Sequence, residues 1–348
     1  MRGCLAIDRI TAIMHCSIPH LESLARAALE RSGARPDNAR SVVRALIAAE
    51  LDDLPSHGLS RVAYYADQTA AGKVDGQASP AVSQSGSVVG VDAHTGFAYP
   101  AIEAGMPSAV AAARDQGIAA LGIHRSHHFG VAGHHVEAMA RQGIVALGFG
   151  NAPAAIAPWG GKRPLFGTDP IAFAAPRVSA DPLVIDLSVS RVARGKVMMA
   201  QRTGEAIPPD WALDRDGQPT TDPAEAMAGS VRPMGDAKGA ALALMVELLA
   251  AGLTGASFAY EASSLFDAEG EPPRLGQLFV LLDPGFFAGG DDFASRVEAM
   301  LTTMAAEPGV RLPGERRLAA RYGHHQTIDL DAAILADLEQ RAGSSASD

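Results

Sequence analysis

The chain has 348 residues, of which 47% are hydrophobic and 20% charged, and its formal net charge is −10 at pH 7. This length suffices for two domains, or for one domain with a large insertion, and the composition is that of a folded globular protein. An acidic chain without a basic footprint is a poor partner for nucleic acid. No apolar run reaches the ~18 residues of a membrane helix, so we predict no membrane span.

The N-terminal residues carry no targeting pattern. Residues 1–19 lack the continuous apolar region and the small-residue cleavage site of a signal peptide. The two cysteines, Cys4 and Cys16, form no CxxC motif and no disulfide framework, which indicates a reducing compartment. We therefore expect a ragged extension over 1–19, with Met14 as a second candidate for the first residue, in a cytoplasmic protein.

Helices are predicted in the first part of the chain. Apolar residues between 21 and 29 recur at helical spacing, and Gly33 ends that helix. Asp37 is the expected N-cap of a second helix. A third helix is expected after Pro55, with Ser56 as its N-cap, running to about Gly72.

The middle of the chain alternates strands and helices, which predicts an α/β layer. Strands are expected at 87–93, 118–123, 144–150, 171–176, 183–188 and 276–284, and helices at 101–117, 134–143, 236–255, 292–307 and 330–342. The Gly- and Pro-rich loop 151–170 is long enough to be functional. No GxGxxG follows a strand, because GFGNAP at 148–153 has proline at the last position. A bound dinucleotide would therefore not lie in a standard Rossmann cradle.

The hexapeptide Ser56 to Arg61, SHGLSR, is the sharpest chemical signal. His57 and Arg61 stand four residues apart, so on a helix both would face the same way. Hydride transfer at C2 of a small carboxylate needs a cation for the carboxylate and a proton donor for the heteroatom, which these two side chains can supply. The alternative is a cap serine followed by an ordinary surface histidine and arginine.

Five histidines at 124, 127, 128, 134 and 135 form a second cluster. A metal-dependent hydrolase or lyase is the rival function that such a cluster suggests, but no HExxH pattern occurs and the cluster contains no cysteine. We favour a strand-end loop in which Gly130 and Gly133 let the backbone approach a ligand, and in which the free amides of the following helix suit a phosphate. Lys238 opens the most apolar helix, and Arg316 and Arg317 follow a Pro-Gly turn, where they could reach a nucleotide phosphate or face water.

These segments together resemble the malate/L-lactate dehydrogenase type 2 family from about residue 20 to 320. The resemblance is carried by SHGLSR (56–61), SHHFGVAGHHVE (126–137), APWGGKRPLFGTDPIAFAAP (157–176), VIDLSVSRVARGKV (184–197) and GDAKGAALALMVELL (235–249). It implies an α/β fold: a non-Rossmann cofactor domain with a mixed sheet over 86–289, and a helical second domain over 20–85 that is joined by C-terminal helices at about 290–345. It also implies a homodimer, bound NADPH or NADH, and no metal.

The resemblance also assigns roles to single residues. Ser56 would be the relay, His57 the proton donor and Arg61 the carboxylate clamp. Thr168, Arg194 and Gly195 would lie beside the substrate. The cofactor would contact His128, Phe129, Gly130, Val131, Ala132, Asp186, Leu187, Ser188, Lys238, Pro313, Gly314, Glu315 and Arg316.

The substrate implied is a small carboxylate, and several remain open. The Ser56–His57 pair favours a cyclic imine, Δ1-pyrroline-2-carboxylate or Δ1-piperideine-2-carboxylate, reduced to the L-amino acid. Lys196 stands where some imine reductases of the family carry an acid, and a lysine there suits the second anionic group of sulfolactate or malate. Asp169 also departs from the more usual asparagine. A 2-hydroxy-acid dehydrogenase is therefore the alternative, and a catalytically silent binding protein of the same fold is a further one.

Overall fold

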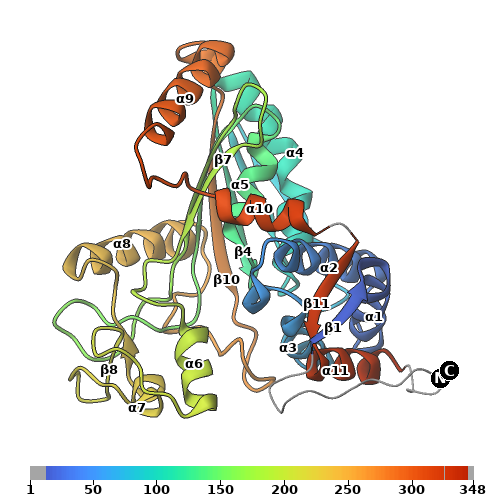
Figure 1. The fold of residues 1–348 in the computed structure, drawn as a ribbon. Coiled ribbons are helices and arrows are strands. Elements are labelled where there is room, and N and C mark those ends of the chain that lie inside the picture. Colours follow the sequence, from blue (N-terminus) through green and yellow to red (C-terminus); the bar gives the residue numbers. More distant parts are fainter. Residues whose placement is uncertain (1–12, 325, 344–348) are drawn as a thin grey trace.

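A computed structural model describes residues 13–324 and 326–343. Its centre is a seven-stranded mixed sheet in the order β2-β3-β4-β10-β5-β6-β7 (Figure 1). Only β3 and β4 pair in parallel, and the other neighbours are antiparallel. The strands are β2 (Ala81–Ser85), β3 (Val88–Asp92), β4 (Ile118–Ser126), β5 (Val145–Gly150), β6 (Ile171–Ala175), β7 (Leu183–Leu187) and β10 (Leu275–Leu282).

Helices cover both faces of this sheet. Strand residues alternate between the faces, so Phe279 and Leu281 of β10 pack in the core under α4 (Ala98–Gln116) and α5 (Ala132–Ala140). Leu278 of the same strand packs on the opposite face, against α8 (Ala237–Glu247) and the π-helical turn Leu248–Gly252. The predicted helix 236–255 thus exists as an α-helix that loosens into a π turn.

A separate helical part is built from both ends of the described chain. It contains α1 (Ile18–Arg31), α2 (Pro36–Leu51), α3 (Val62–Ala70) and α11 (Ala332–Ala342), which share one apolar core. Residues 13–19, expected within a ragged extension, instead form β1 (Ile13–Ser17) and the start of α1, and β1 pairs with β11 (Thr327–Asp331). Residues 1–12 of that expected extension lie outside the described residues.

The C-terminal helices divide between the two parts. α9 (Gly290–Ala305), expected to join the helical part, lies at the far end of the sheet in Figure 1, and its Glu298 pairs with Arg177 after β6. α10 (Glu315–Gly323) crosses from the sheet toward α2. A small third unit, absent from the sequence expectations, packs α6 (Arg194–Thr203), α7 (Pro223–Ala228), β8 (Ala212–Leu213) and β9 (Ser230–Val231) around their own apolar core.

The loops that follow β4, β5 and β7 all leave the same end of the sheet. β4, β5 and β7 end there and β6 and β10 begin there, because Ser126 pairs with Leu275, Gly150 with Gln277 and Leu187 with Ile171. None of the helices within the described residues has the length and apolar character needed to cross a membrane.

Candidate active site

The candidate segments leave the same end of the sheet. The loop after β4 carries His127 and His128, the long loop 151–170 joins β5 to β6, and 186–188 ends β7. The helical part meets this end through Tyr65 of α3, whose hydroxyl lies 2.6 Å from Nδ1 of His128. The sheet end and the helical part therefore meet at His128.

The segment from Ser56 to Arg61 is not the start of a long helix. Pro55–His57 and Leu59–Arg61 are two short 3-10 turns, and α3 begins only at Val62. Between the turns, a Cβ on Gly58 would lie 2.1 Å from Oε1 of Glu50, the oxygen that accepts the amide hydrogen of Leu59 at 2.6 Å. The Glu50 carboxylate thus fills the space that a side chain at position 58 would need, and Gly58 itself is not helical, with φ −96° and ψ −146°. The predicted N-cap role of Ser56 is therefore wrong.

His57 and Arg61 nevertheless belong to one local unit. Nε of Arg61 donates to the carbonyl oxygen of Ser56 at 2.7 Å, and Oγ of Ser56 lies 3.0 Å from Nδ1 of His57. Burial lowers the pKa of His57 to about 4, and the Arg61 charge adds to this effect. The imidazole is therefore neutral at pH 7 and can accept a proton.

Arg61 offers a free edge to an anion. Its guanidinium carbon lies 5.1 Å from the ring centroid of Phe266, and among the described residues no carboxylate comes within 4 Å of it. Because Nε is already bonded to Ser56, the two Nη groups remain for a bidentate contact with a carboxylate.

The five clustered histidines point in different directions. Nε2 of His134 bonds to Asp52 at 2.7 Å, Nε2 of His135 to the carbonyl oxygen of Phe129 at 2.7 Å, and His124 lies 3.7 Å from Asp92. The cluster thus provides no common ligand set. Across residues 13–324 and 326–343, no group of three or more histidine, cysteine or acidic side chains is placed to hold a metal ion.

Two of the histidines stack at the site. The rings of His57 and His128 lie 5.5 Å apart at an interplanar angle of 25°. Burial lowers the pKa of His128 well below its ordinary value, and Arg61 and His57 add to the effect. A neutral, hydrogen-bonded His128 therefore supports the face of His57 without adding charge.

Gly130 and Gly133, the two glycines of the loop after β4, make close contacts within the protein. Gly130 has a φ of 70°, and a Cβ there would lie 2.5 Å from the Tyr99 hydroxyl. The amide of Gly133 donates to Oδ2 of Asp186 at 2.7 Å. The protein itself fills the space beside the Cα of Gly130, and the amide of Gly133, the second residue of α5, already has a partner. The approach of a ligand to these glycines stays a prediction. Phe129, Val131 and Ala132 are likewise buried.

The other expected cofactor residues contact β7 at two places. A Cβ on Gly314 would lie 3.3 Å from the carbonyl oxygen of Val184, which places the 313–316 turn over the first half of this strand. The start of α8, with exposed Lys238, is tied to the other end of the strand, because the amide of Met234 donates to the carbonyl of Val189 at 2.8 Å. Arg316, Glu315 and Leu187 are also exposed. Segments far apart in sequence thus meet along one strand.

The expected substrate residues lie on the long loop and on α6. The carbonyl of Thr168 accepts bonds from the amide of Val189 at 3.0 Å and from Oγ of Ser188 at 2.9 Å. Arg194 is half-buried and donates to the carbonyl of Ala154 at 3.2 Å, while Gly195 and Lys196 are exposed beside it. Neither Arg194 nor Lys196 pairs with an acid among the described residues. The contact with Ala154 places this second cationic group beside the loop that follows β5, on a different element from Arg61. Figure 1 shows α6 and α3 on opposite sides of that end of the sheet.

A buried acid pair that the sequence did not reveal holds the long loop. Asp169 is fully buried, and among the described groups no donor hydrogen-bonds either of its carboxyl oxygens. Its neighbour Glu247 accepts from the amides of Gly167 at 3.2 Å and Ala259 at 3.0 Å. Burial and then the Glu247 charge raise the pKa of Asp169 well above its ordinary value. The raised pKa favours the neutral form of the Asp169 carboxyl beside Glu247.

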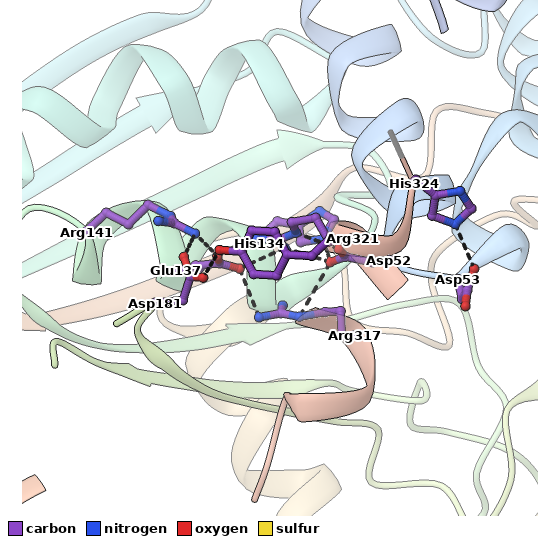
Figure 2. A network of polar contacts seen from close by, with 10 residues as sticks. Asp52, Asp53, His134, Glu137, Arg141, Asp181, Arg317, Arg321 and His324 are labelled. Atoms are coloured by element: carbon purple, nitrogen blue, oxygen red, sulfur yellow. Dashed lines mark hydrogen bonds and ion pairs between the residues drawn. The ribbon is translucent and has the colours of Figure 1, made fainter. Parts of the chain in front are cut away.

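An ion network joins the three elements that meet at the site (Figure 2). Asp52 after α2 bonds to His134 of α5 and, at 2.7 and 2.8 Å, to Arg321 of α10. Arg317 of α10 lies 2.9 Å from Glu137 and 3.4 Å from Asp52. Arg317 is therefore used within the protein, and of the two arginines in the 313–317 segment only Arg316 remains free to contact a ligand.

Comparison with known proteins identifies the family. The sequence profile described as malate/L-lactate dehydrogenase matches residues 16–339. The chain belongs to the malate/L-lactate dehydrogenase family. This confirms the resemblance drawn from the motifs and makes the protein a nicotinamide-dependent oxidoreductase.

Relatives within the family act on different compounds. The chain is 53% identical over 94% of its length to a (2R)-3-sulfolactate dehydrogenase (NADP(+)) of Chromohalobacter salexigens, and covers 98% of that protein. It is 43% identical over 89% of its length to a Δ1-pyrroline-2-carboxylate/Δ1-piperideine-2-carboxylate reductase of Pseudomonas putida, covering 92% of it. Among solved structures, Δ1-piperideine-2-carboxylate reductase from Pseudomonas syringae matches with a TM-score of 0.88 at 39% identity, over 94% of this chain and 99% of that one.

Proposed function

We propose that this enzyme transfers a hydride between NADP(H) and C2 of a small 2-hydroxy or 2-oxo carboxylate that carries a second anionic group, with 3-sulfolactate as the first candidate. The observation that carries the proposal is the pair of cationic groups at one end of the sheet, Arg61 on one side and Arg194 with Lys196 on the other. Among the described residues none of the three has an acidic partner. The 53% identity to a sulfolactate dehydrogenase supports it.

The side chains fit the proton and charge movements of this reaction. Arg61 binds the C1 carboxylate through its Nη edge, and Arg194 and Lys196 attract the second anion. The nicotinamide, when bound, accepts or supplies the hydride at C2. In the oxidation, neutral His57 takes the hydroxyl proton. In the reduction, the bound carboxylate offsets the Arg61 charge that lowers the pKa of His57, so the imidazole is more readily protonated and returns the proton.

The residues along β7 fit the phosphates of a dinucleotide without a Rossmann cradle. Lys238 and Arg316 are exposed, and neither pairs with an acid among the described residues. Since Arg317 is held by Glu137, Arg316 is the arginine available to a 2′-phosphate. Arg316→Ala should raise the KM for NADPH about tenfold and leave that for NADH unchanged. Equal changes for both coenzymes would refute this role.

Cyclic imine reduction is the second candidate. Oγ of Ser56 lies 3.0 Å from Nδ1 of His57, so the serine can hold the tautomer that protonates the nitrogen of the product amine. The 43% identity to the Pseudomonas putida imine reductase supports this candidate. A cyclic imine has a single carboxylate, so Arg61 would suffice to bind it.

A substrate panel with a matched variant separates the candidates. The purified protein is assayed by nicotinamide absorbance with sulfolactate, malate and lactate in oxidation, and with pyrroline- and piperideine-2-carboxylate in reduction. We expect the highest kcat/KM for sulfolactate, and Lys196→Ala should raise the KM for sulfolactate several-fold more than that for lactate. A higher kcat/KM for an imine would favour the second candidate, and no turnover of any compound would refute both.

We also propose that the enzyme is a homodimer. Leu244 of α8, Leu248 of the π turn and Leu253 just after it have 46%, 53% and 69% of their surfaces accessible. Large exposed apolar side chains gathered in one segment are typical of a subunit contact. Light scattering should give the mass of two chains, and Leu248→Glu should reduce it to that of one. A wild-type monomer would contradict the proposal.

A further inference from the structure

One loop outside every motif reaches from the sheet side of the molecule to the proposed carboxylate clamp. Residues 256–274 connect the π turn after α8 to β10, and Phe266 lies near the middle of this loop. Its ring lies under the guanidinium of Arg61 at 5.1 Å and meets the ring of Tyr64 edge-on at 5.9 Å. Both of these partners belong to the helical part, so the loop bridges the two parts of the protein.

A buried lysine fixes the loop in this position. The Lys73 side chain is completely inaccessible to solvent. Its Nζ donates to the carbonyl of Ser264 at 2.7 Å and to the carbonyl and carboxylate oxygens of Asp267 at 3.2 and 3.1 Å. Burying an ammonium group is costly unless all its hydrogens are bonded, and here all of those bonds go to one short segment.

A second side chain makes the same connection. Nε2 of Gln68, also fully buried, donates to the carbonyl of Asp267 at 2.8 Å. Two buried polar groups of the helical part thus hold the two ends of the segment Ser264–Asp267, and Phe266 between them has little freedom to move.

We propose that Phe266 is a positioning residue, and that the segment Ser264–Asp267 sets the affinity for the substrate carboxylate by holding Arg61. Nε of Arg61 is fixed by the Ser56 carbonyl, which leaves rotation about the last bonds of the side chain. An aromatic ring below the guanidinium plane restricts that rotation and keeps the two Nη groups directed at one place. This inference rests on the proposed role of Arg61 as the clamp.

Phe266→Leu is the variant that tests the proposal, because leucine keeps the apolar contact and removes the aromatic face. A guanidinium–aromatic contact of this kind corresponds to an effect of about tenfold on binding. We expect the KM for the carboxylate substrate to rise about tenfold, with kcat within twofold and the affinity for NADPH unchanged. Phe266→Trp should keep the wild-type KM, because tryptophan retains an aromatic face. The carboxamide analogue of the substrate should show no difference between Phe266→Leu and wild type, because it lacks the charge that Arg61 binds.

Controls separate the failure of this inference from failure of the proposed function. Phe287→Leu removes an aromatic ring that is 71% exposed after the 3-10 turn Pro284–Phe286 and should change nothing. Arg61→Lys should raise the same KM. If Arg61→Lys raises this KM and Phe266→Leu does not, the positioning role of Phe266 is refuted while the role of Arg61 as the clamp stands. If Phe266→Leu lowers kcat and NADPH affinity together, Phe266 acts in general folding and its positioning role is refuted. If neither variant changes KM, Arg61 is not the clamp, and both proposals fail.

Discussion

Replacing Asp52 by asparagine is the sharpest test of how the two parts of the protein are held together. The Asp52 carboxylate is fully buried and bonds to Arg321 through both oxygens and to His134 at 2.7 Å (Figure 2). Asparagine keeps the shape and removes the charge, so Arg317 and Arg321 are left to share Glu137. Breaking a buried ion pair costs about 3–5 kcal/mol. Because Arg321 is 23% exposed and keeps one partner, we take the lower limit of about 3 kcal/mol.

This cost is measurable as a fall in melting temperature. About 2 °C per kcal/mol applies to a chain of this size, so the Tm of Asp52→Asn should fall by ~6 °C in calorimetry at pH 7. Asp210→Asn, which disrupts an exposed pair with Arg191, is the matched control and should leave the Tm unchanged. If the two variants melt at the same temperature, the network does not join the parts as we argue.

The pH dependence gives an independent check. Burial raises the pKa of Asp52, but the bonds from His134 and Arg321 outweigh it and leave the pKa below its ordinary value of 3.8. A lowered pKa stabilises the folded protein above that ordinary value, and the stabilisation is lost as the pH falls through the lowered value. The difference in Tm between wild type and Asp52→Asn should therefore be complete at pH 7 and shrink below pH 3.8.

Three further outcomes follow from the site. His57, with a pKa of about 4, should cause kcat/KM for the oxidation to fall only as the pH drops through about 4, and a break near 6.5 would contradict its burial. His57→Ala should lower kcat about 100-fold or more in either direction, and full activity would refute its role as proton carrier. Asp169→Asn should raise the Tm at pH 8 and not at pH 3, because the raised pKa of Asp169 costs stability once the unfolded carboxyl ionises; an equal rise at both pH values would contradict the raised pKa.

Much of the fold was predictable because its signals are local. Helical periodicity gave α1 and α2, and short apolar runs bounded by glycine or charge gave all strands of the large sheet except β2. β2 was missed because all five of its residues are exposed at the sheet edge, so no buried face marks it. β1 and β11 were missed for a different reason. They pair across the length of the chain, and short segments carry no sequence signal of so distant a partner.

The site was only partly predictable, and the reasons are physical. The residue types at Ser56, His57 and Arg61 indicate the chemistry, but the break at Gly58 packs against a carboxylate from the preceding helix, Glu50, and no local pattern shows this contact. Phe266 lies in a loop without periodicity, and its place under Arg61 depends on the buried Lys73. A side chain whose role depends on partners far away in the sequence produces no residue spacing that sequence analysis can detect.

The distribution of charge explains how an acidic protein can bind an anionic substrate and an anionic cofactor. The chain carries a net charge of −10, so its overall field repels both. The arginines of α10 that face Asp52 and Glu137 are neutralised inside the protein, and they contribute structure rather than attraction. Arg61 and Lys196 have no acid within 4 Å among the described residues. Attraction therefore depends on a few unpaired cations at one end of the sheet, and adding salt should weaken binding of a doubly charged substrate more than that of a singly charged one.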